Sequence, residues 1–231
     1  MTEILRQGLR ELGLDEGRAD GLERFSRLLL EKNRVMNLTA ITEPEAVARL
    51  HMLDSAALTR FVSLSGRSVV DVGTGAGFPG MPLRILQDDF ELTLLDSLGK
   101  RILWLREVCA ELGLARVECV HARAEEFAAA HRERYDLAVS RAVAQLNVLC
   151  ELALPLVKVG GRFLAMKSVD TEEEISAAKS AVKTLGGRIV GVEDYRIPTC
   201  EVVHRVVIVE KTAATDARYP RAFAKIKKQP L

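Results

Sequence analysis

The feature that most limits the fold of this chain is an alternation of two patterns that begins at Ser68. Short β-branched or apolar runs such as "SVVDVG", "ELTLLDS" and "YDLAVSRA" are separated by segments with helical periodicity, for example "LGKRILWLREVCAELGL". Strands that alternate with helices pair in parallel, because the helix carries the chain back across the sheet. The pattern therefore predicts an α/β fold with a doubly wound parallel sheet.

Both ends of the chain depart from this alternation. Residues 1–65 carry apolar side chains at three- and four-residue spacing, which predicts a helical cap. Near the other end, "GRIVGVEDYRI" and "EVVHRVVIVEK" are separated only by residues 198–200, too few for a crossover helix, and predict an antiparallel hairpin. We expect a cap (1–65), a domain with the Rossmann-like sheet of class I methyltransferases (66–210) and a tail (211–231).

The stretch "VVDVGTGAGFPG", residues 69–80, follows the first strand and contains two overlapping glycine patterns. Asp71 with Gly73, Gly75 and Gly77 is typical of proteins that bind S-adenosylmethionine, whereas Gly75, Gly77 and Gly80 match a dinucleotide pattern. Both cofactors use glycines so that backbone can approach the ligand closely. The glycines alone do not choose between them.

Neighbouring residues favour the methyl donor. The carboxylate of Asp71 is placed to accept the ammonium group of a methionine moiety, and Pro79 and Pro82 displace the helix start past the glycines. Asp96 ends the second predicted strand, where an acid accepts hydrogen bonds from ribose hydroxyls. Because both cofactors carry a ribose, Asp96 supports a nucleoside without deciding which one, and an NAD(P)-dependent oxidoreductase stays open at this point.

Composition and charge exclude some classes of protein but do not indicate a function. The 231 residues carry a net charge of +1, and the four cysteines form no C-x-x-C pair. No leader pattern, membrane-length apolar run or metal-ligand spacing is present, so we expect a cytoplasmic protein without a metal. Residues 211–231 hold six basic residues against one acid, Asp216. This tail is a candidate to follow RNA phosphates, and its candidate residues are Arg218, Arg221, Lys225, Lys227 and Lys228.

Several of these segments together resemble the RsmG family, also called glucose-inhibited division protein B. They are "NLTAI", "HMLDS", "VVDVGTGAGFPGMPLRIL", "LLDSLGKRILWLREV", "ARAEEF" and "SRAVAQL", with the terminal "YPRAFAKIKKQPL". The tail departs from the family's Gly-x-Pro at Ala224 and Ile226. The resemblance implies a methyltransferase that transfers the methyl group of S-adenosylmethionine to N7 of one guanine in the 530 loop of 16S ribosomal RNA, either naked or in the small subunit. We expect the protein to be a monomer.

The resemblance also implies roles for single residues. Gly73 and Phe78 are expected at the methionine end of the cofactor, Ala124 and Glu125 at the adenine, and Arg141 at the rim between cofactor and base. A non-catalytic RNA-binding assembly factor with the same fold remains the second alternative.

Chemistry narrows what a catalytic residue has to do. Guanine N7 has a free lone pair and no proton, so we expect positioning rather than a general base. Arg123, Arg141 and Lys167 follow the carboxyl ends of predicted strands, where ligands bind in an open α/β sheet, and are the candidates for that role. His51 and Asp54 lie three apart on a predicted cap helix, from which they could face the cofactor pocket, but we expect them to make helix-capping or surface hydrogen bonds instead.

Overall fold

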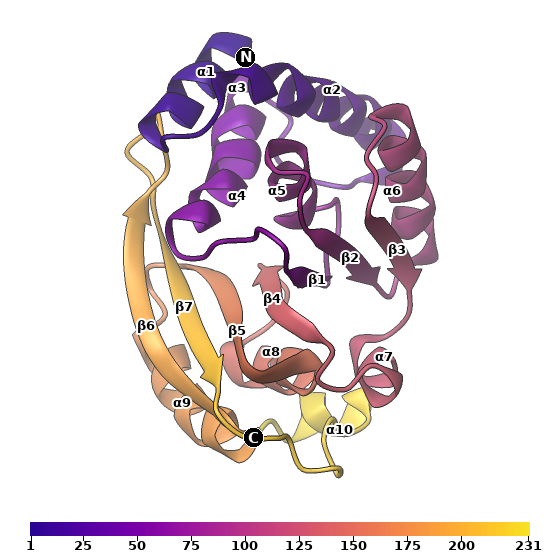
Figure 1. Cartoon of the computed structure of the whole chain (residues 1–231), viewed down its shortest axis with the longest axis vertical. Coiled ribbons are helices and arrows are strands. Elements are labelled where there is room, and N and C mark those ends of the chain that lie inside the picture. Colours follow the sequence, from indigo (N-terminus) through magenta and orange to yellow (C-terminus); the bar gives the residue numbers. More distant parts are fainter.

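The computed structural model describes residues 1–231 and contains one seven-stranded sheet with the order β3-β2-β1-β4-β5-β7-β6 (Figure 1). Strands β1 to β5 pair in parallel. Strand β7 pairs antiparallel with both β5 and β6. The predicted parallel sheet with a closing hairpin is therefore confirmed.

The elements follow the predicted alternation. The strands are β1 (Ser68–Val72), β2 (Glu91–Asp96), β3 (Val117–His121), β4 (Tyr135–Arg141), β5 (Val157–Ser168), β6 (Gly187–Arg196) and β7 (Val203–Lys211). The α-helices are α1 (Thr2–Glu11), α2 (Ala19–Met36), α3 (Pro44–Val47), α4 (Asp54–Ala56), α5 (Gly80–Leu86), α6 (Gly99–Glu111), α7 (Ala124–Ala130), α8 (Leu146–Ala153), α9 (Glu172–Thr184) and α10 (Phe223–Lys228). No helix is long and apolar enough to span a bilayer.

Each face of the sheet is covered by its own set of helices. Alternate strand residues point to opposite faces, so Val69 belongs to one core and Val70 to the other. Helices α1, α2, α3, α5 and α6 supply the first core, and helices α7 to α10 supply the second. Both faces are thus buried, as the apolar strands require.

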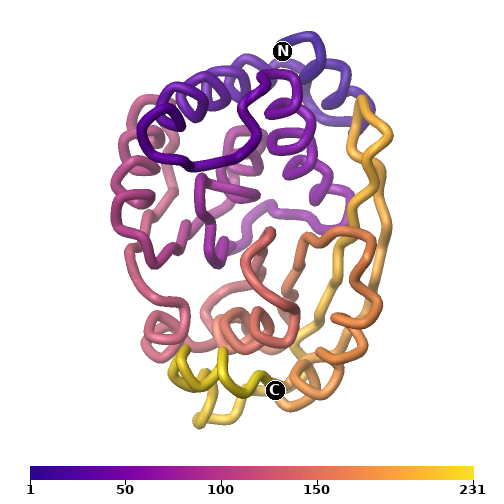
Figure 2. The backbone as a smooth tube through the Cα atoms, turned by 180° about the vertical axis from the view of Figure 1, so that it is seen from behind, coloured from indigo at the N-terminus to yellow at the C-terminus, as the bar shows by residue number.

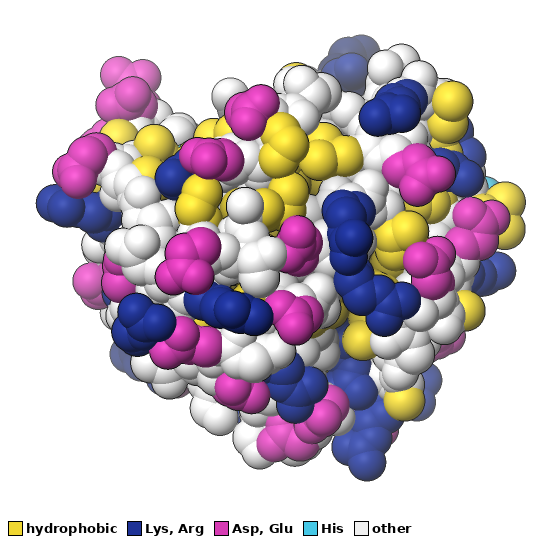
Figure 3. Space-filling view, turned by 90° about the horizontal axis from the view of Figure 1, so that it is seen from above, with side chains coloured by type: hydrophobic (Ala, Val, Ile, Leu, Met, Phe, Trp, Pro, Cys, Tyr) yellow, Lys and Arg dark blue, Asp and Glu magenta, His cyan; other side chains and the backbone are white.

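The cap and the sheet share one hydrophobic core. Leu5, Phe25 and Met52 from the cap are fully buried with Leu94 and Leu164 of the sheet. In the backbone trace the cap arches over the upper edge of the sheet and reaches the β6–β7 hairpin (Figure 2). The outer face of the cap shows acidic and basic side chains interspersed (Figure 3), in keeping with exposed pairs such as Arg6–Asp20. The cap is therefore built into the sheet domain.

A short π-helical segment interrupts the cap next to the sheet. Residues Ala48–Leu53 form a π turn between α3 and α4, and the Ser55 hydroxyl donates to the His51 carbonyl at 2.6 Å. Such turns widen a helix locally and are frequent at functional sites. This turn places His51 and Asp54 at the carboxyl edge of the sheet.

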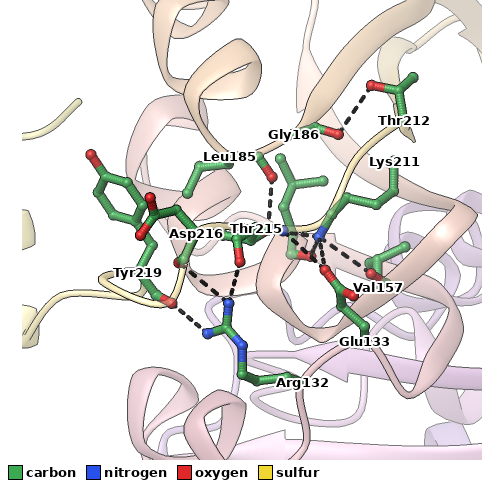
Figure 4. Close-up of polar contacts among 11 residues, drawn as sticks. Arg132, Glu133, Val157, Leu185, Gly186, Lys211, Thr212, Thr215, Asp216 and Tyr219 are labelled. Carbon is green, nitrogen blue, oxygen red and sulfur yellow. Dashed lines mark hydrogen bonds and ion pairs between the residues drawn. The ribbon is translucent and has the colours of Figure 1, made fainter.

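The tail is fastened to the domain at its start (Figure 4). The ammonium group of Lys211 is completely buried and donates to the Leu154 carbonyl and the Thr215 hydroxyl, both at 2.6 Å. Arg132 donates to the carbonyls of Thr215 and Tyr219 at 2.5 Å. The tail then packs along α8, where Ile226 is fully buried. It is a folded part of the domain.

Candidate functional site

The glycine loop between β1 and α5 has used nearly all of its own backbone donors. The amides of Gly73 and Thr74 donate to the Leu95 carbonyl, and the amides of Gly77 and Phe78 donate to the Thr74 carbonyl, at 2.9–3.0 Å. The Gly75 amide donates to Asp96 Oδ2 at 2.9 Å. A pyrophosphate group needs free amides at such a loop. Few amides of the loop are left to bind a pyrophosphate, which disfavours a dinucleotide.

Asp71 lies beneath this loop rather than facing a cavity. Its side chain is fully buried, and Oδ2 accepts the Thr74 hydroxyl at 2.7 Å and the Gly80 amide at 2.8 Å. Burial raises the pKa of Asp71 to about 7, against the lowering effect of these hydrogen bonds. The predicted direct contact with an ammonium group needs correction, because Asp71 ties the loop and the start of α5 to strand β1.

The glycines of the loop divide between two tasks. Gly73 and Gly75 line a cavity of about 360 Å³, and both have positive φ angles. Gly77 turns away from it, since a Cβ there would stand 2.6 Å from the Met81 Cγ atom. The prediction that all three bind cofactor is corrected for Gly77, which allows the loop to pack on α5.

Asp96, at the end of β2, stands where two cavities meet. One is the 360 Å³ cavity, which Phe78 also lines, and the other is a cavity of about 190 Å³ lined by Ala124 and Glu125. Asp96 Oδ1 accepts the Leu98 amide at 2.8 Å, so the carboxylate has a fixed orientation. Phe223 of the tail forms another part of the smaller cavity. The two cavities share Gly73, Asp96 and Val143 in their linings, and we call them together the donor cleft.

Arg141, at the end of β4, borders a further cavity. This acceptor cavity measures about 580 Å³ and shares His51, Arg141 and Ala142 with the donor cleft. The guanidinium donates to the Leu50 carbonyl at 2.9 Å, to Asp54 Oδ2 at 3.0 Å and to His51 Nδ1 at 2.9 Å. It also lies over the Phe78 ring at 4.7 Å. Arg141 is therefore held rigidly at the boundary of the two cavities.

The expectation of surface hydrogen bonds for His51 and Asp54 was wrong, and His51 takes the alternative position, in the lining of the donor cleft. His51 is 8% exposed and Asp54 is completely buried. Burial, with the charge of Arg141, lowers the pKa of His51 to about 4, so the ring is neutral and its Nε2–H donates to the Thr39 hydroxyl at 2.8 Å. Burial raises the pKa of Asp54, but hydrogen bonding to His204 and the charge of Arg141 outweigh it and lower the net value. Asp54 is thus the anion that balances Arg141.

Asp54 also connects the cap to the hairpin. Its Oδ1 accepts the Tyr195 hydroxyl at 2.8 Å and a hydrogen bond from His204 Nδ1 at 2.9 Å. We call Thr39, His51, Asp54, Arg141, Tyr195 and His204 the arginine network. Its members come from the cap, β4, β6 and β7, and this buried network fixes the geometry of Arg141.

The other two predicted positioning residues do not lie together. Lys167 lines the acceptor cavity with Arg141 and donates to Glu174 Oε1 at 2.5 Å and to the Ala144 carbonyl at 2.6 Å. Arg123 lines the small cavity of the donor cleft, pairs with Glu125 at 2.6 Å and stacks on Phe223 at 4.5 Å. Arg123 is therefore revised from a residue beside the reacting base to one beside the nucleoside end of the cleft.

The predicted RNA-binding residues of the tail also separate. Arg221 forms a bidentate pair with the nearly buried Glu151, at 2.6 and 2.8 Å, and this contact removes it from the candidates for phosphate binding. Arg218, Lys225, Lys227 and Lys228 are exposed. These four remain available to a nucleic acid.

Comparison with known proteins decides the family. The sequence matches the family GidB, rRNA small subunit methyltransferase G, over residues 18–228. Ribosomal RNA small subunit methyltransferase G of Alkaliphilus metalliredigens is 45% identical, covering 99% of this chain and 98% of its own, and that of Alkaliphilus oremlandii is 44% identical, covering 100% and 99%. The chain belongs to this family. Family membership makes it an rRNA methyltransferase whose methyl donor is S-adenosylmethionine.

Solved structures agree on the fold. The M. jannaschii TYW2 structure in complex with AdoMet matches with a TM-score of 0.55 at 16% identity, over 68% of this chain and 74% of that one. A SAM-dependent methyltransferase from Aquifex aeolicus matches with a TM-score of 0.52 at 17% identity, over 71% and 92%. At such low identity these similarities establish the class I methyltransferase sheet and nothing finer.

The donor cleft fits S-adenosylmethionine. The loop has few amides left for a phosphate group, and the fixed Asp96 carboxylate lines both the cavity beside Gly73 and Phe78 and the cavity beside Ala124 and Glu125. A molecule with a ribose between an amino acid and a purine matches this order. The residues that sequence reasoning missed are Thr39, Glu174, Tyr195, His204 and Phe223. Two of them stand in segments that carry the resemblance, Thr39 within "NLTAI" and Phe223 within "YPRAFAKIKKQPL", whereas Glu174, Tyr195 and His204 stand in none of these segments.

Proposed function

We propose that this chain transfers the methyl group of S-adenosylmethionine to N7 of one guanine in the 530 loop of 16S rRNA, in the cytoplasm. The observation that carries the proposal is the meeting of two cavities at Arg141. The donor cleft lies on one side of it, and the larger acceptor cavity lies on the other. Family membership supplies the substrate class, and the resemblance described above supplies the nucleotide.

The chain's residues have to position two reactants, because no proton transfer precedes attack by N7. The bound cofactor supplies a methyl group activated by its sulfonium charge. Asp96 holds the ribose hydroxyls and Phe78 closes the methionine end, while Arg141 keeps the boundary between the cavities in one geometry. Holding the two reactants in one orientation lowers the activation barrier, because much of the entropy is already lost when they bind.

The exposed part of the tail is the proposed phosphate contact. Arg218, Lys225, Lys227 and Lys228 carry charge without a buried partner, and α10 lies against α8, near the adenine end of the donor cleft (Figure 1). Phosphate contacts by such residues make affinity fall as salt rises. We expect rRNA binding to weaken steadily with added salt.

The test is methyl transfer to purified small ribosomal subunits and to naked 16S rRNA, followed by mapping of the modified base. N7-methylguanosine is located by borohydride and aniline cleavage. We expect one new cleavage, in the 530 loop, and its absence with the protein intact and folded would refute the assignment. S-adenosylhomocysteine should raise the melting temperature, and NAD should not, which separates this proposal from an oxidoreductase.

Arg141→Ala tests the boundary residue. We expect turnover to fall by about 100-fold or more, because the misplaced reactants lose their alignment. Arg188→Ala removes an arginine whose side chain is 69% exposed and provides the matched control, with turnover unchanged. Full turnover by Arg141→Ala with unchanged rRNA and cofactor affinity would remove Arg141 from the mechanism.

A further inference from the structure

The acceptor cavity is lined by both apolar and charged side chains. Ile41, Leu50, Met166 and Val202 supply apolar surface. Arg141 also lines the donor cleft, whereas Lys167 and Glu174 line the acceptor cavity and not the donor cleft. A volume of about 580 Å³ lies within the usual range for small-molecule sites, so a single nucleoside fits it.

Glu174 is held rigidly but keeps one oxygen free of protein partners. Its Oε1 accepts the Leu146 amide and the Lys167 ammonium group, and these contacts fix the carboxylate at the first turn of α9. Its Oε2 accepts no hydrogen bond from the chain and is not sealed from solvent, since the side chain is 21% exposed. The cavity lining therefore presents one unoccupied anionic acceptor.

Lys167 keeps one donor in the same way. An ammonium group has three N–H donors, and the Ala144 carbonyl and Glu174 take two of them. Its side chain is only 9% exposed, so water does not satisfy the third freely. A free acceptor and a free donor therefore stand side by side in the lining of the acceptor cavity.

We propose that Glu174, with Lys167, reads the Watson–Crick edge of the target guanine and makes the site specific for guanine. The inference rests on the proposed function. Guanine presents two donors on this edge, N1–H and the N2 amino group, next to the acceptor O6. Glu174 Oε2 accepts from N1–H and N2–H, and Lys167 donates to O6, while N7 faces the boundary at Arg141.

The same arrangement rejects adenine. Adenine has an acceptor at N1, no amino group at C2 and a donor at C6. The acceptor Glu174 Oε2 would therefore face another acceptor, and the Lys167 ammonium group would face another donor. A buried polar group left without its partner costs more than a missing apolar contact, and sites built on hydrogen bonds therefore discriminate strongly. A base read in this way must first be flipped out of the RNA stack into the cavity.

Glu174 also suits the charge that methylation creates. Transfer to N7 leaves a positive charge on the purine and makes N1–H a stronger donor. A carboxylate that accepts from N1–H consequently gains strength as the reaction proceeds, because charge-assisted hydrogen bonds are the stronger ones. The prediction is an effect on kcat as well as on KM.

The experiment compares Glu174→Gln with the wild-type enzyme on small subunits reconstituted with guanosine or inosine at the target position. Inosine lacks the N2 amino group but keeps N7, O6 and N1–H. Glu174→Gln keeps the shape and an acceptor for Leu146 and Lys167, so folding should survive. Glu173→Gln, an exposed neighbour in the same turn of α9, is the matched control.

We expect wild type and Glu173→Gln to prefer guanosine over inosine by about tenfold in kcat/KM, the worth of one hydrogen bond to a charged group. Glu174→Gln should lose roughly 100-fold on guanosine, through kcat and KM together, and should lose most of the preference. Its affinity for S-adenosylhomocysteine should stay within about twofold of wild type, because Glu174 does not line the donor cleft.

Two results distinguish a failure of the proposed function from a failure of the inference about Glu174. If wild type does not methylate the guanine at all, the proposed function is wrong. If wild type methylates it and Glu174→Gln keeps the same preference for guanosine, Glu174 only caps α8 and holds Lys167, and the inference alone is overturned.

Discussion

The donor cleft and the acceptor cavity are neighbours that share Arg141, but different parts of the chain form them. The donor cleft is shaped by backbone: glycines with positive φ angles, amides that bond within the loop, and Asp96 bonded to two amides. The acceptor cavity is shaped by charged side chains, among them Asp54, Arg141, Lys167 and Glu174, and the Arg141–Asp54 pair joins elements that are distant in sequence.

This difference predicts unequal sensitivity to changes of charge. A loop whose amides are satisfied locally does not depend on the ionisation of remote groups. A buried arginine depends on its counterion, because breaking a buried ion pair leaves a charge without compensation. Substitutions that remove charge should therefore disturb the acceptor side far more than the donor side.

The largest expected effect comes from Asp54→Ala. Removing this buried carboxylate leaves Arg141 without its anion and Tyr195 and His204 without their acceptor, so we expect a loss of about 3–5 kcal/mol in the free energy of unfolding. Urea denaturation measures it. Glu45→Ala, which breaks an exposed pair with Arg49 in the same cap, should cost about 1 kcal/mol or less.

Asp54→Asn keeps the shape of the side chain and tests the site if the alanine variant does not fold. We expect its rRNA turnover to fall strongly while S-adenosylhomocysteine binds almost as in wild type. An equal loss of rRNA turnover and of S-adenosylhomocysteine binding would show that the acceptor cavity and the donor cleft do not respond separately to a loss of charge.

The next effect is the contribution of His51 to the dependence of stability on pH. Its pKa is about 4 in the folded protein and 6.5 in the unfolded chain. As pH falls from 6.5 to 4, the unfolded chain binds a proton that the folded protein excludes, so stability is lost, by up to about 3 kcal/mol.

His51→Asn should lack this part of the pH dependence. We expect the difference in unfolding free energy between wild type and His51→Asn to shift against wild type as the pH is lowered through this window, measured by denaturation at several pH values. His121→Asn, at an exposed position, controls for the loss of a histidine. Parallel curves for wild type and His51→Asn would contradict a buried, neutral imidazole.

The same difference explains what could be predicted from the sequence. The strands, the glycine loop and Asp96 were predictable, because their patterns are local and their partners lie a few residues or one strand away. The burial of His51 and Asp54 was not, since it depends on Tyr195 and His204, about 150 residues further along the chain. Arg221 was misjudged for a related reason: its charge is visible in the sequence, but its partner Glu151 is not.

The smallest expected effect tests whether the donor cleft is entirely local. Phe223 comes from the tail, yet it lines the small cavity with Ala124 and Glu125 and stacks on Arg123. Phe223→Ala should weaken the binding of S-adenosylhomocysteine by about tenfold, as loss of an aromatic wall would, without changing turnover at saturating cofactor. Titration calorimetry measures the change.

Lys227→Ala is the matched variant, because Lys227 lies on the same short helix but is exposed. It should leave the affinity for S-adenosylhomocysteine unchanged and weaken rRNA binding at low salt. If Phe223→Ala bound S-adenosylhomocysteine as tightly as wild type, the donor cleft would be complete without the tail. The contrast between a locally built donor cleft and an acceptor cavity assembled from distant side chains would then be sharper still.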